Sequence, residues 1–197
     1  MTGALIEMIR AAPRLARPDI AQRRLASLMA RADAAPLAES LAHAPLRDLA
    51  LGLADHSTYL WGLVAEDPSR LARLAAASPR RSLDRLVGEM AARRDESEAE
   101  VMRALRLAKR EAALLIALAD IGGLWSLGEV TEALSRFADG AVACALRFLL
   151  RQNAAAGRLV IDAETPAPEV GCGLVVLALG KHGARELNYS SDVDLIV

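Results

Sequence analysis

The sequence predicts an α+β chain, a mostly α-helical bundle followed by the first two strands of a sheet. Of the residues, 53% are hydrophobic but only 3% are aromatic, and abundant alanine, leucine and arginine favour helices packed through small aliphatic side chains. An apolar run at 174–179 and an alternating run at 191–197 are typical of strands instead. We therefore expect a helical region over 1–165 and the start of a second domain over 166–197.

The first part of the helical region is predicted to consist of short helices. Proline removes a backbone donor and clashes with the preceding turn, so each proline in residues 1–55 marks a helix boundary. The next block is expected to form two short helices divided at Asp67 and Pro68. Tyr59 and Trp61 in this block could contact a partner, but packing in the helical core is the favoured interpretation.

Two long helices are predicted before the sheet. Asp95 and Glu98 form a pattern like a capping box, and apolar residues follow at helical spacing. Ser126 and Glu129 form a second capping box and open another long helix. Because only a few residues join them, the two helices should pack antiparallel as a hairpin. Residues 153–171 are expected to link this hairpin to the sheet.

The first strand ends at a glycine-containing turn. The apolar run at 174–179 suits a strand buried on both faces. Gly180 and Gly183 can take positive φ and let the backbone approach a ligand, so the amides after the strand can turn toward an anion such as a phosphate. Lys181 adds a positive charge there. We predict that Gly180 and Lys181 bind a nucleotide phosphate; the alternative is a plain tight turn.

The second strand carries two carboxylates. The strand period of two places Asp192 and Asp194 on one face, with Val193 and Leu195 on the other. Two carboxylates on one face repel each other unless they share a cation, and Mg²⁺ takes carboxylate oxygens together with substrate phosphates. We predict that Asp192 and Asp194 are catalytic metal ligands for Mg²⁺ (or Mn²⁺). A solvated edge strand fits less well, because the opposite face is apolar.

The spacing of this segment resembles a known superfamily. A strand, a glycine with a polar residue, about ten residues and then Asp-hydrophobic-Asp is similar to the DNA polymerase β-type nucleotidyltransferases. The whole run from 179 to 196 resembles the signature of bifunctional glutamine synthetase adenylyltransferase/adenylyl-removing enzymes. The shared residues are Gly180, Lys181, Gly183, Glu186, Ser190, Ser191, Asp192 and Asp194. The chain departs from the signature at Leu179, His182 and Ala184.

Other residues of the motif have alternative roles. Ser190 and Ser191 could donate hydrogen bonds to a phosphate, or they could only cap the connection and the strand. Arg185 and Glu186 are expected to form an ion pair that fixes the connecting segment. His182 lies near the predicted phosphates, but the resembling family usually has an apolar residue there, so a catalytic role is disfavoured.

The resemblance implies a function. Members of the family attach AMP to a tyrosine of glutamine synthetase and remove it, under the control of the PII signalling protein. A motif preceded directly by a helical region resembles the unit that removes AMP, where phosphate would attack the adenylyl phosphorus and ADP would form. The implied partners are glutamine synthetase, the PII protein, nucleotide (ATP or ADP) and phosphate, in the cytoplasm.

The resemblance also implies that the site is incomplete. A polymerase β-type site needs a third carboxylate from a later strand, so we expect this chain to be the N-terminal fragment of a longer enzyme with little activity alone. One competing hypothesis is a non-catalytic helical module that binds glutamine synthetase or a PII-type regulator. A nucleotidyltransferase acting on a small molecule is a third, but it leaves the long motif and the helical region unexplained.

Charge and hydrophobicity argue against two further classes of protein, and the cysteines indicate a reducing compartment. A formal net charge of -1 gives no electrostatic case for binding nucleic acid, and the longest apolar segment is too short to span a membrane. Cys144 and Cys172 lack metal-type spacing, so we expect two buried free thiols in a reducing compartment.

Overall fold

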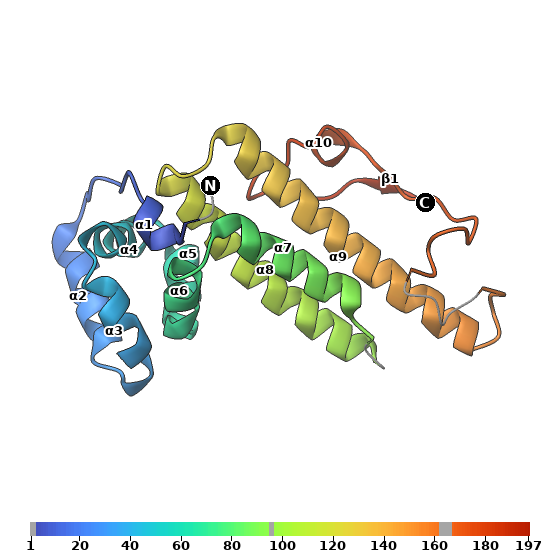
Figure 1. The fold of residues 1–197 in the computed structure, drawn as a ribbon, viewed down its shortest axis with the longest axis horizontal. Coiled ribbons are helices and arrows are strands. Elements are labelled where there is room, and N and C mark those ends of the chain that lie inside the picture. The colour runs from blue at the N-terminus through green and yellow to red at the C-terminus, as the bar shows by residue number, and fades with distance from the viewer. Residues whose placement is uncertain (1–2, 95–96, 162–166) are drawn as a thin grey trace. The chain divides into compact units, whose positions relative to one another are not determined.

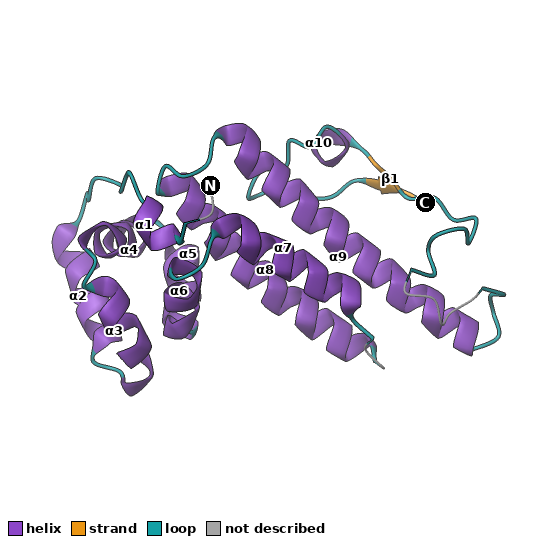
Figure 2. Cartoon of the chain, viewed as in Figure 1, coloured by secondary structure: helices purple, strands orange, loops and turns teal. Residues whose placement is uncertain are grey.

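The computed structural model describes residues 3–94, 97–161 and 167–197. Over these residues the chain is mostly helical, with one two-stranded sheet near its C-terminal end (Figures 1 and 2). The predicted α+β class, helical with two strands, is therefore confirmed. None of the described helices is long and apolar enough to cross a membrane.

The chain divides into two compact units, which are described separately. The first comprises Met1–Leu83 with Arg110–Val130, and the second comprises Asp84–Lys109 with Thr131–Val197. The boundary predicted at 165/166 falls among residues that the structure does not describe, and it remains a prediction.

Short helices make up the N-terminal part of the first unit, as predicted. In chain order they are α1 (Leu5–Met8), α2 (Pro18–Met29), the 3-10 helix η1 (Ala32–Ala34), α3 (Ala35–Leu41), α4 (Ala44–His56), α5 (Thr58–Glu66) and α6 (Pro68–Ala75). Prolines open α2, α3, α4 and α6 at the first or second helical position, where a missing N–H costs no intrahelical bond. Proline therefore starts helices here rather than only ending them.

The division between α5 and α6 lies where the sequence predicts it. Asp67 caps α6 by accepting a hydrogen bond from the Arg70 amide at 3.2 Å. Ser57 caps α5 in the same way, through the Leu60 amide at 3.1 Å. The expected core packing of Tyr59 is wrong, because this side chain is 56% exposed; Trp61 is half-buried. The core of these helices is built mainly from leucine and alanine, as the low aromatic content leads one to expect.

Three longer helices follow: α7 (Pro79–Ala92), α8 (Glu98–Ile121) and α9 (Leu127–Ala155). The capping box of α9 is confirmed, since the Ser126 amide donates to Glu129 at 2.8 Å and the Glu129 amide donates to the Ser126 hydroxyl at 3.4 Å. A capping box at the start of α8 is formed by Ser97 and Glu100, with distances of 3.0 and 3.3 Å. Asp95, predicted to cap this helix, lies outside the described residues.

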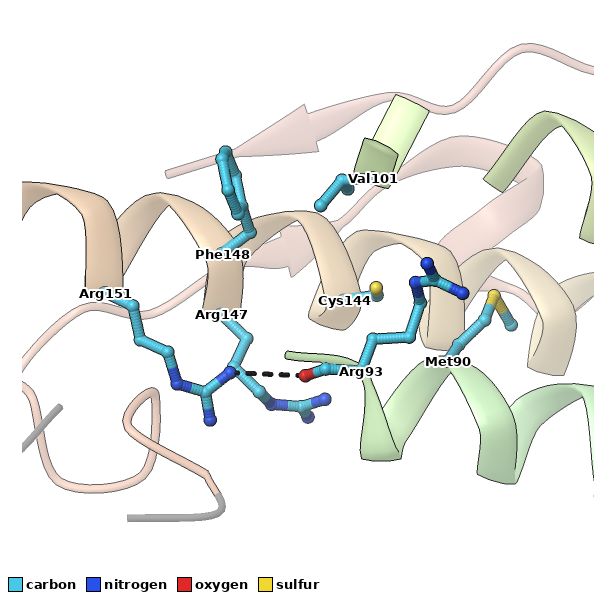
Figure 3. Close-up of a pocket in the computed structure, with 7 residues that line it drawn as sticks. All are labelled: Met90, Arg93, Val101, Cys144, Arg147, Phe148 and Arg151. Carbon is cyan, nitrogen blue, oxygen red and sulfur yellow. Dashed lines mark hydrogen bonds between the residues drawn. The ribbon is translucent and has the colours of Figure 1, made fainter. Parts of the chain in front are cut away.

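In the second unit, the start of α8 packs against the C-terminal part of α9, so the predicted antiparallel hairpin is confirmed there. Figure 3 shows the contact around a cavity of about 10 Å³. The residues that line this cavity are Met90, Arg93, Val101, Cys144, Arg147, Phe148 and Arg151. A space of this size holds at most one water molecule, so this is a packed interior and not a ligand site. Cys144 is buried as predicted, whereas Cys172 is partly exposed.

The sheet is smaller and more exposed than predicted. Strands β1 (Leu177–Ala178) and β2 (Leu195–Ile196) pair antiparallel, with Leu177 opposite Ile196 and Ala178 opposite Leu195. Leu177 and Ile196 are 54% and 53% exposed, so the prediction of a strand buried on both faces is wrong. The physical reason is that this pair is the whole sheet in the described residues, and two strands cannot cover their own faces.

Candidate nucleotide site

The turn after β1 is shaped by two glycines in different ways. Gly180 has φ +55°, in agreement with the positive φ expected from the sequence, and it begins the helical turn α10 (Gly180–Gly183). A Cβ atom at Gly180 would lie 3.1 Å from Oδ2 of Asp194. Gly183 does not have positive φ; a Cβ atom there would instead overlap the carbonyl oxygen of Ala178. Gly180 thus brings the turn against Asp194, and Gly183 lets the turn pack onto its own strand.

Backbone hydrogen bonds close the turn from within. The amides of Gly183 and Ala184 donate to the carbonyls of Leu179 and Gly180 at 3.0 Å, and the Glu186 amide donates to the Lys181 carbonyl at 2.7 Å. The amides of Gly183, Ala184 and Glu186 are therefore already hydrogen-bonded. The first amides of a helical turn have no carbonyl partner within it, so those at the start of α10 are the ones that could bind an anion. The Lys181 side chain is exposed beside them. The placement suits the phosphate role predicted for Gly180 and Lys181, which remains a prediction.

The two predicted metal ligands lie on the segment that leads into β2. Asp192 and Asp194 are both exposed, and the Asp194 carbonyl accepts a hydrogen bond from the Leu179 amide at 2.9 Å. This bond ties the second strand to the end of the first, directly before Gly180. Among the described residues, no group of three or more Asp, Glu, His or Cys side chains could hold a metal ion.

These carboxylates fit Mg²⁺ in kind. Mg²⁺ prefers oxygen ligands and commonly takes one or two carboxylates, with waters and substrate phosphates completing six positions. Asp192 and Asp194 are two exposed oxygen donors of this type, and Asp194 lies next to the turn where a phosphate is predicted. Their roles as metal and catalytic residues stay predictions.

A polar turn precedes the carboxylates and involves a residue that the sequence analysis missed. Asn188 Oδ1 accepts hydrogen bonds from the Ser190 amide and the Ser191 hydroxyl, each at 3.0 Å. The Ser191 hydroxyl in turn accepts the Asn188 amide at 3.1 Å. The Ser191 hydroxyl therefore shapes this turn, while the phosphate role of Ser190 and Ser191 stays a prediction. An Asn two residues before a serine is a recognisable turn signal and could have been used.

Arg185 and His182 bind residues far away in the sequence. The predicted ion pair between Arg185 and Glu186 is wrong. Arg185 instead donates to both carboxylate oxygens of Glu132, at 2.5 and 2.7 Å, and to Asp139 at 3.0 Å. His182 is buried, with Nε2 at 2.8 Å from the other oxygen of Asp139. The Arg185 guanidinium points toward a face of α9 that carries two acids, so it pairs with them and not with the neighbouring Glu186.

The electrostatics agree with this geometry. Hydrogen bonds from Arg185 hold the pKa of the Glu132 carboxyl below its usual value. The bonds to Glu132 and then to Asp139 raise the pKa of the Arg185 guanidinium. Glu132 and Asp139 were not singled out from the sequence, although their spacing of seven places both on one face of a helix.

A second anchor holds the segment that leads to β1. Arg147 of α9, which is buried, donates to both carboxylate oxygens of Glu169, with Nη2 at 2.5 Å and Nε at 3.1 and 3.2 Å. Its Nη1 donates to the Ala91 carbonyl of α7 at 2.9 Å. Burial disfavours the charged form of Glu169, but the Arg147 hydrogen bonds prevail and the pKa of this carboxyl is lowered. In the second unit, α9 is thus the support on which both ends of the site segment are fixed.

Comparisons with known proteins agree with the motif. The sequence model of the family "Glutamate-ammonia ligase adenylyltransferase" matches residues 49–197. Bifunctional glutamine synthetase adenylyltransferase/adenylyl-removing enzymes from Xanthobacter autotrophicus and Rhodopseudomonas palustris (strain BisB5) are 49% and 48% identical, over 98% and 99% of this chain. The match to the enzyme of Bradyrhizobium sp. (strain BTAi1) is 48% identical over 98% of the chain.

The chain spans about 20% of the length of each of these relatives. No solved structure matches the chain. The family match covers the helices from α4 onward and the whole of the candidate site, and the relatives extend the similarity to nearly all of the chain. The chain therefore belongs to the glutamate-ammonia ligase adenylyltransferase family.

Proposed function

We propose that this chain is part of an enzyme that regulates glutamine synthetase by reversible adenylylation of a tyrosine, and that it contributes to the half that removes AMP. The observation that carries the proposal is the close approach of Gly180 to Asp194, since a Cβ atom at Gly180 would lie 3.1 Å from Oδ2 of that residue. The family to which the chain belongs supports the choice of substrate. A helical region directly before the motif supports the choice of the AMP-removing half.

The proposed reaction is a phosphorolysis. A phosphate oxygen attacks the adenylyl phosphorus, the bond from phosphorus to the tyrosine oxygen breaks, and the tyrosine oxygen takes up a proton, which leaves ADP and free tyrosine. Lys181 and the first amides of α10 would orient a phosphate group, and Asp192 and Asp194 would hold Mg²⁺ (or Mn²⁺). The bound cation would neutralise charge on the transferring group. Most of the acceleration then comes from positioning.

Asp192 and Asp194 would supply two of the three carboxylates that such a site requires. We therefore expect slow turnover or none from this chain alone, and full activity only where a further strand adds the third acid. The partners would be glutamine synthetase, a PII-type protein, ATP or ADP and phosphate, and the location would be the cytoplasm.

The test is calorimetry of Mg²⁺ and ADP binding, with this chain compared with a version lengthened to match its relatives. The lengthened protein should bind the metal nucleotide, and Asp192→Asn with Asp194→Asn should abolish binding. Asp84→Asn is the matched control, because Asp84 is an exposed acid that pairs with Arg136 at 2.8 Å. Binding that survives loss of both site aspartates would refute the assignment.

A helical module that binds glutamine synthetase or a PII-type regulator is the second candidate, and one surface feature favours it. In the first unit, a hollow of about 300 Å³ is lined by side chains of α2 and α5 and by Arg31, which directly precedes η1. These are Arg23, Arg24, Ser27, Leu28, Arg31, Trp61 and Ala65. Tryptophan and arginine are enriched where proteins bind one another. Arg81, an exposed residue of α7 that does not line this hollow, provides the control. If Trp61→Ala weakens binding to either partner while Arg81→Ala does not, the chain acts as a binding module, whether or not it also takes part in catalysis.

A further inference from the structure

The turn that is expected to meet the phosphate is tied to α9 by side chains at its far end. Arg185 spans two acids on α9, and His182 binds one of the same acids from inside the turn. Glu132 and Asp139 lie seven residues apart, which is about two helical turns, so both face the same side. Each of their four carboxylate oxygens accepts from the turn. The two acids therefore hold this segment at two points along a rigid helix.

The backbone conformation of Arg185 also bears on this connection. Arg185 has φ +59°, and in the described residues it is the one non-glycine residue with positive φ. Such a conformation is unfavourable for a side chain with a Cβ and persists where its surroundings enforce it, often at ligand clamps. Here Arg185 is the left-handed residue that ends α10, with the Glu186 amide bonded to the Lys181 carbonyl at 2.7 Å and its own amide bonded to the His182 carbonyl at 3.0 Å. The fork of hydrogen bonds to Glu132 and Asp139 then holds the side chain of this residue on α9.

His182 strengthens the same connection from within. Its ring is only 3% exposed, and Nε2 lies 2.8 Å from Oδ1 of Asp139. His182 thus makes a buried polar contact between the turn and α9. Because Lys181 and Gly180 immediately precede His182, any displacement of the imidazole moves the expected phosphate ligands directly.

We propose that Glu132 and Asp139 are positioning residues: through Arg185 and His182 they fix the Gly180–Lys181 turn against Asp194 and so set the affinity of the site for phosphate. The inference rests on the proposed function for the identity of the ligand. The positioning itself rests on the contacts described above. A purely stabilising pair of surface ion pairs is the competing account, and it predicts a change in stability without a change at the turn.

The first experiment measures amide hydrogen exchange in this chain. Glu132→Gln and Asp139→Asn keep size and shape while weakening the bonds to Arg185 and His182. Exchange at the amides of 183–186 should rise by about tenfold or more in the double variant, while exchange in the interior of α9 should stay unchanged. Asp84→Asn, which removes an exposed acid bonded to Arg136 and not to the turn, is the control and should leave 183–186 unchanged.

The second experiment measures phosphorolysis in the version lengthened to match the relatives. The double variant should raise the KM for phosphate by about 10- to 100-fold, with a smaller change in kcat, since a misplaced ligand loses binding geometry. A merely structural role would lower the melting temperature and leave the KM unchanged. Arg185→Lys should also raise the KM for phosphate, because one ammonium cannot reproduce the bonds to two acids.

The outcomes separate the two proposals. If the lengthened protein binds no nucleotide, the proposed function fails, and exchange at 183–186 still decides whether α9 positions the turn. If it turns over and the variants match the wild type in KM, the positioning inference is overturned while the function stands. Unchanged exchange at 183–186 in the double variant overturns the inference in either case.

Discussion

At the scale of single residues, the site depends on how closely two backbone segments approach. Gly183 packs onto the Ala178 carbonyl so tightly that no Cβ atom fits, and Gly180 lies against the Asp194 carboxylate. Neither contact involves a long side chain. The position of the turn relative to Asp194 therefore depends on glycine at both positions as well as on the ion pairs to α9.

We expect Gly183→Ala to destabilise the second unit by about 1 to 3 kcal/mol, because the new methyl group forces the turn away from β1. Urea denaturation would measure the change in the free energy of unfolding. Gly88→Ala is the matched control: Gly88 lies inside α7 and a Cβ atom there meets nothing within 4 Å. That change should stabilise the protein by up to about 1 kcal/mol through helix propensity. Equal effects of the two substitutions would contradict the close approach at Gly183.

At the scale of elements, local signals in the sequence were good guides. Proline positions located the starts of four helices, and the Ser126–Glu129 pattern located the start of α9. At the start of α8 the sequence contains two overlapping patterns of the same spacing, Asp95 with Glu98 and Ser97 with Glu100, and the structure shows the second.

Contacts between elements could not be predicted in the same way. The partners of Arg185 lie 46 and 53 residues away, and nothing in a single sequence distinguishes Glu132 from other exposed acids on a helix. The adjacent Glu186 was the wrong choice because short sequence separation does not imply that two side chains face each other. For the site, the sequence thus identifies the motif, and the structure identifies what supports it.

The anchor between α9 and the segment before β1 makes a prediction about pH. The pKa of Glu169 is lowered in the folded protein, so its contribution to stability is complete above the pKa of about 4.3 in the unfolded chain. That contribution is lost as pH falls through the folded-state value. Glu169→Gln should therefore cost about 1 to 3 kcal/mol near neutral pH, and the difference from wild type should shrink steadily below about pH 4.3.

Denaturation curves of both proteins over a series of pH values would measure this. Glu98→Gln, a change at an exposed acid in the first turn of α8, should alter stability by no more than about 0.5 kcal/mol. If the destabilisation caused by Glu169→Gln instead grew as the pH fell, the pH dependence would have the opposite sign and the anchor would be refuted.

At the scale of the whole molecule, apolar surface is concentrated at the β1–β2 pair. The sheet has two open edges in the described residues, and its residues Leu177 and Ile196 are 54% and 53% exposed. Val175, which precedes β1, is 64% exposed. Exposed apolar side chains on unpaired strand edges promote association with other chains. Single exposed leucines elsewhere, such as Leu107 on α8 at 45%, lack a neighbouring edge and do not present backbone donors and acceptors.

We therefore expect this chain to self-associate through the sheet as its concentration rises. Sedimentation velocity over a range of concentrations should show larger species, and Leu177→Lys with Ile196→Lys should suppress them, because charge on an edge strand opposes pairing. Leu107→Lys adds the same type of charge at a similarly exposed leucine on a helix and should leave association unchanged. Lengthening the chain to match its relatives should suppress association as well if the added residues pair with this sheet. If the Leu107→Lys control dissociates the larger species as effectively as the strand variants, general surface charge is responsible and the sheet is not the site of association.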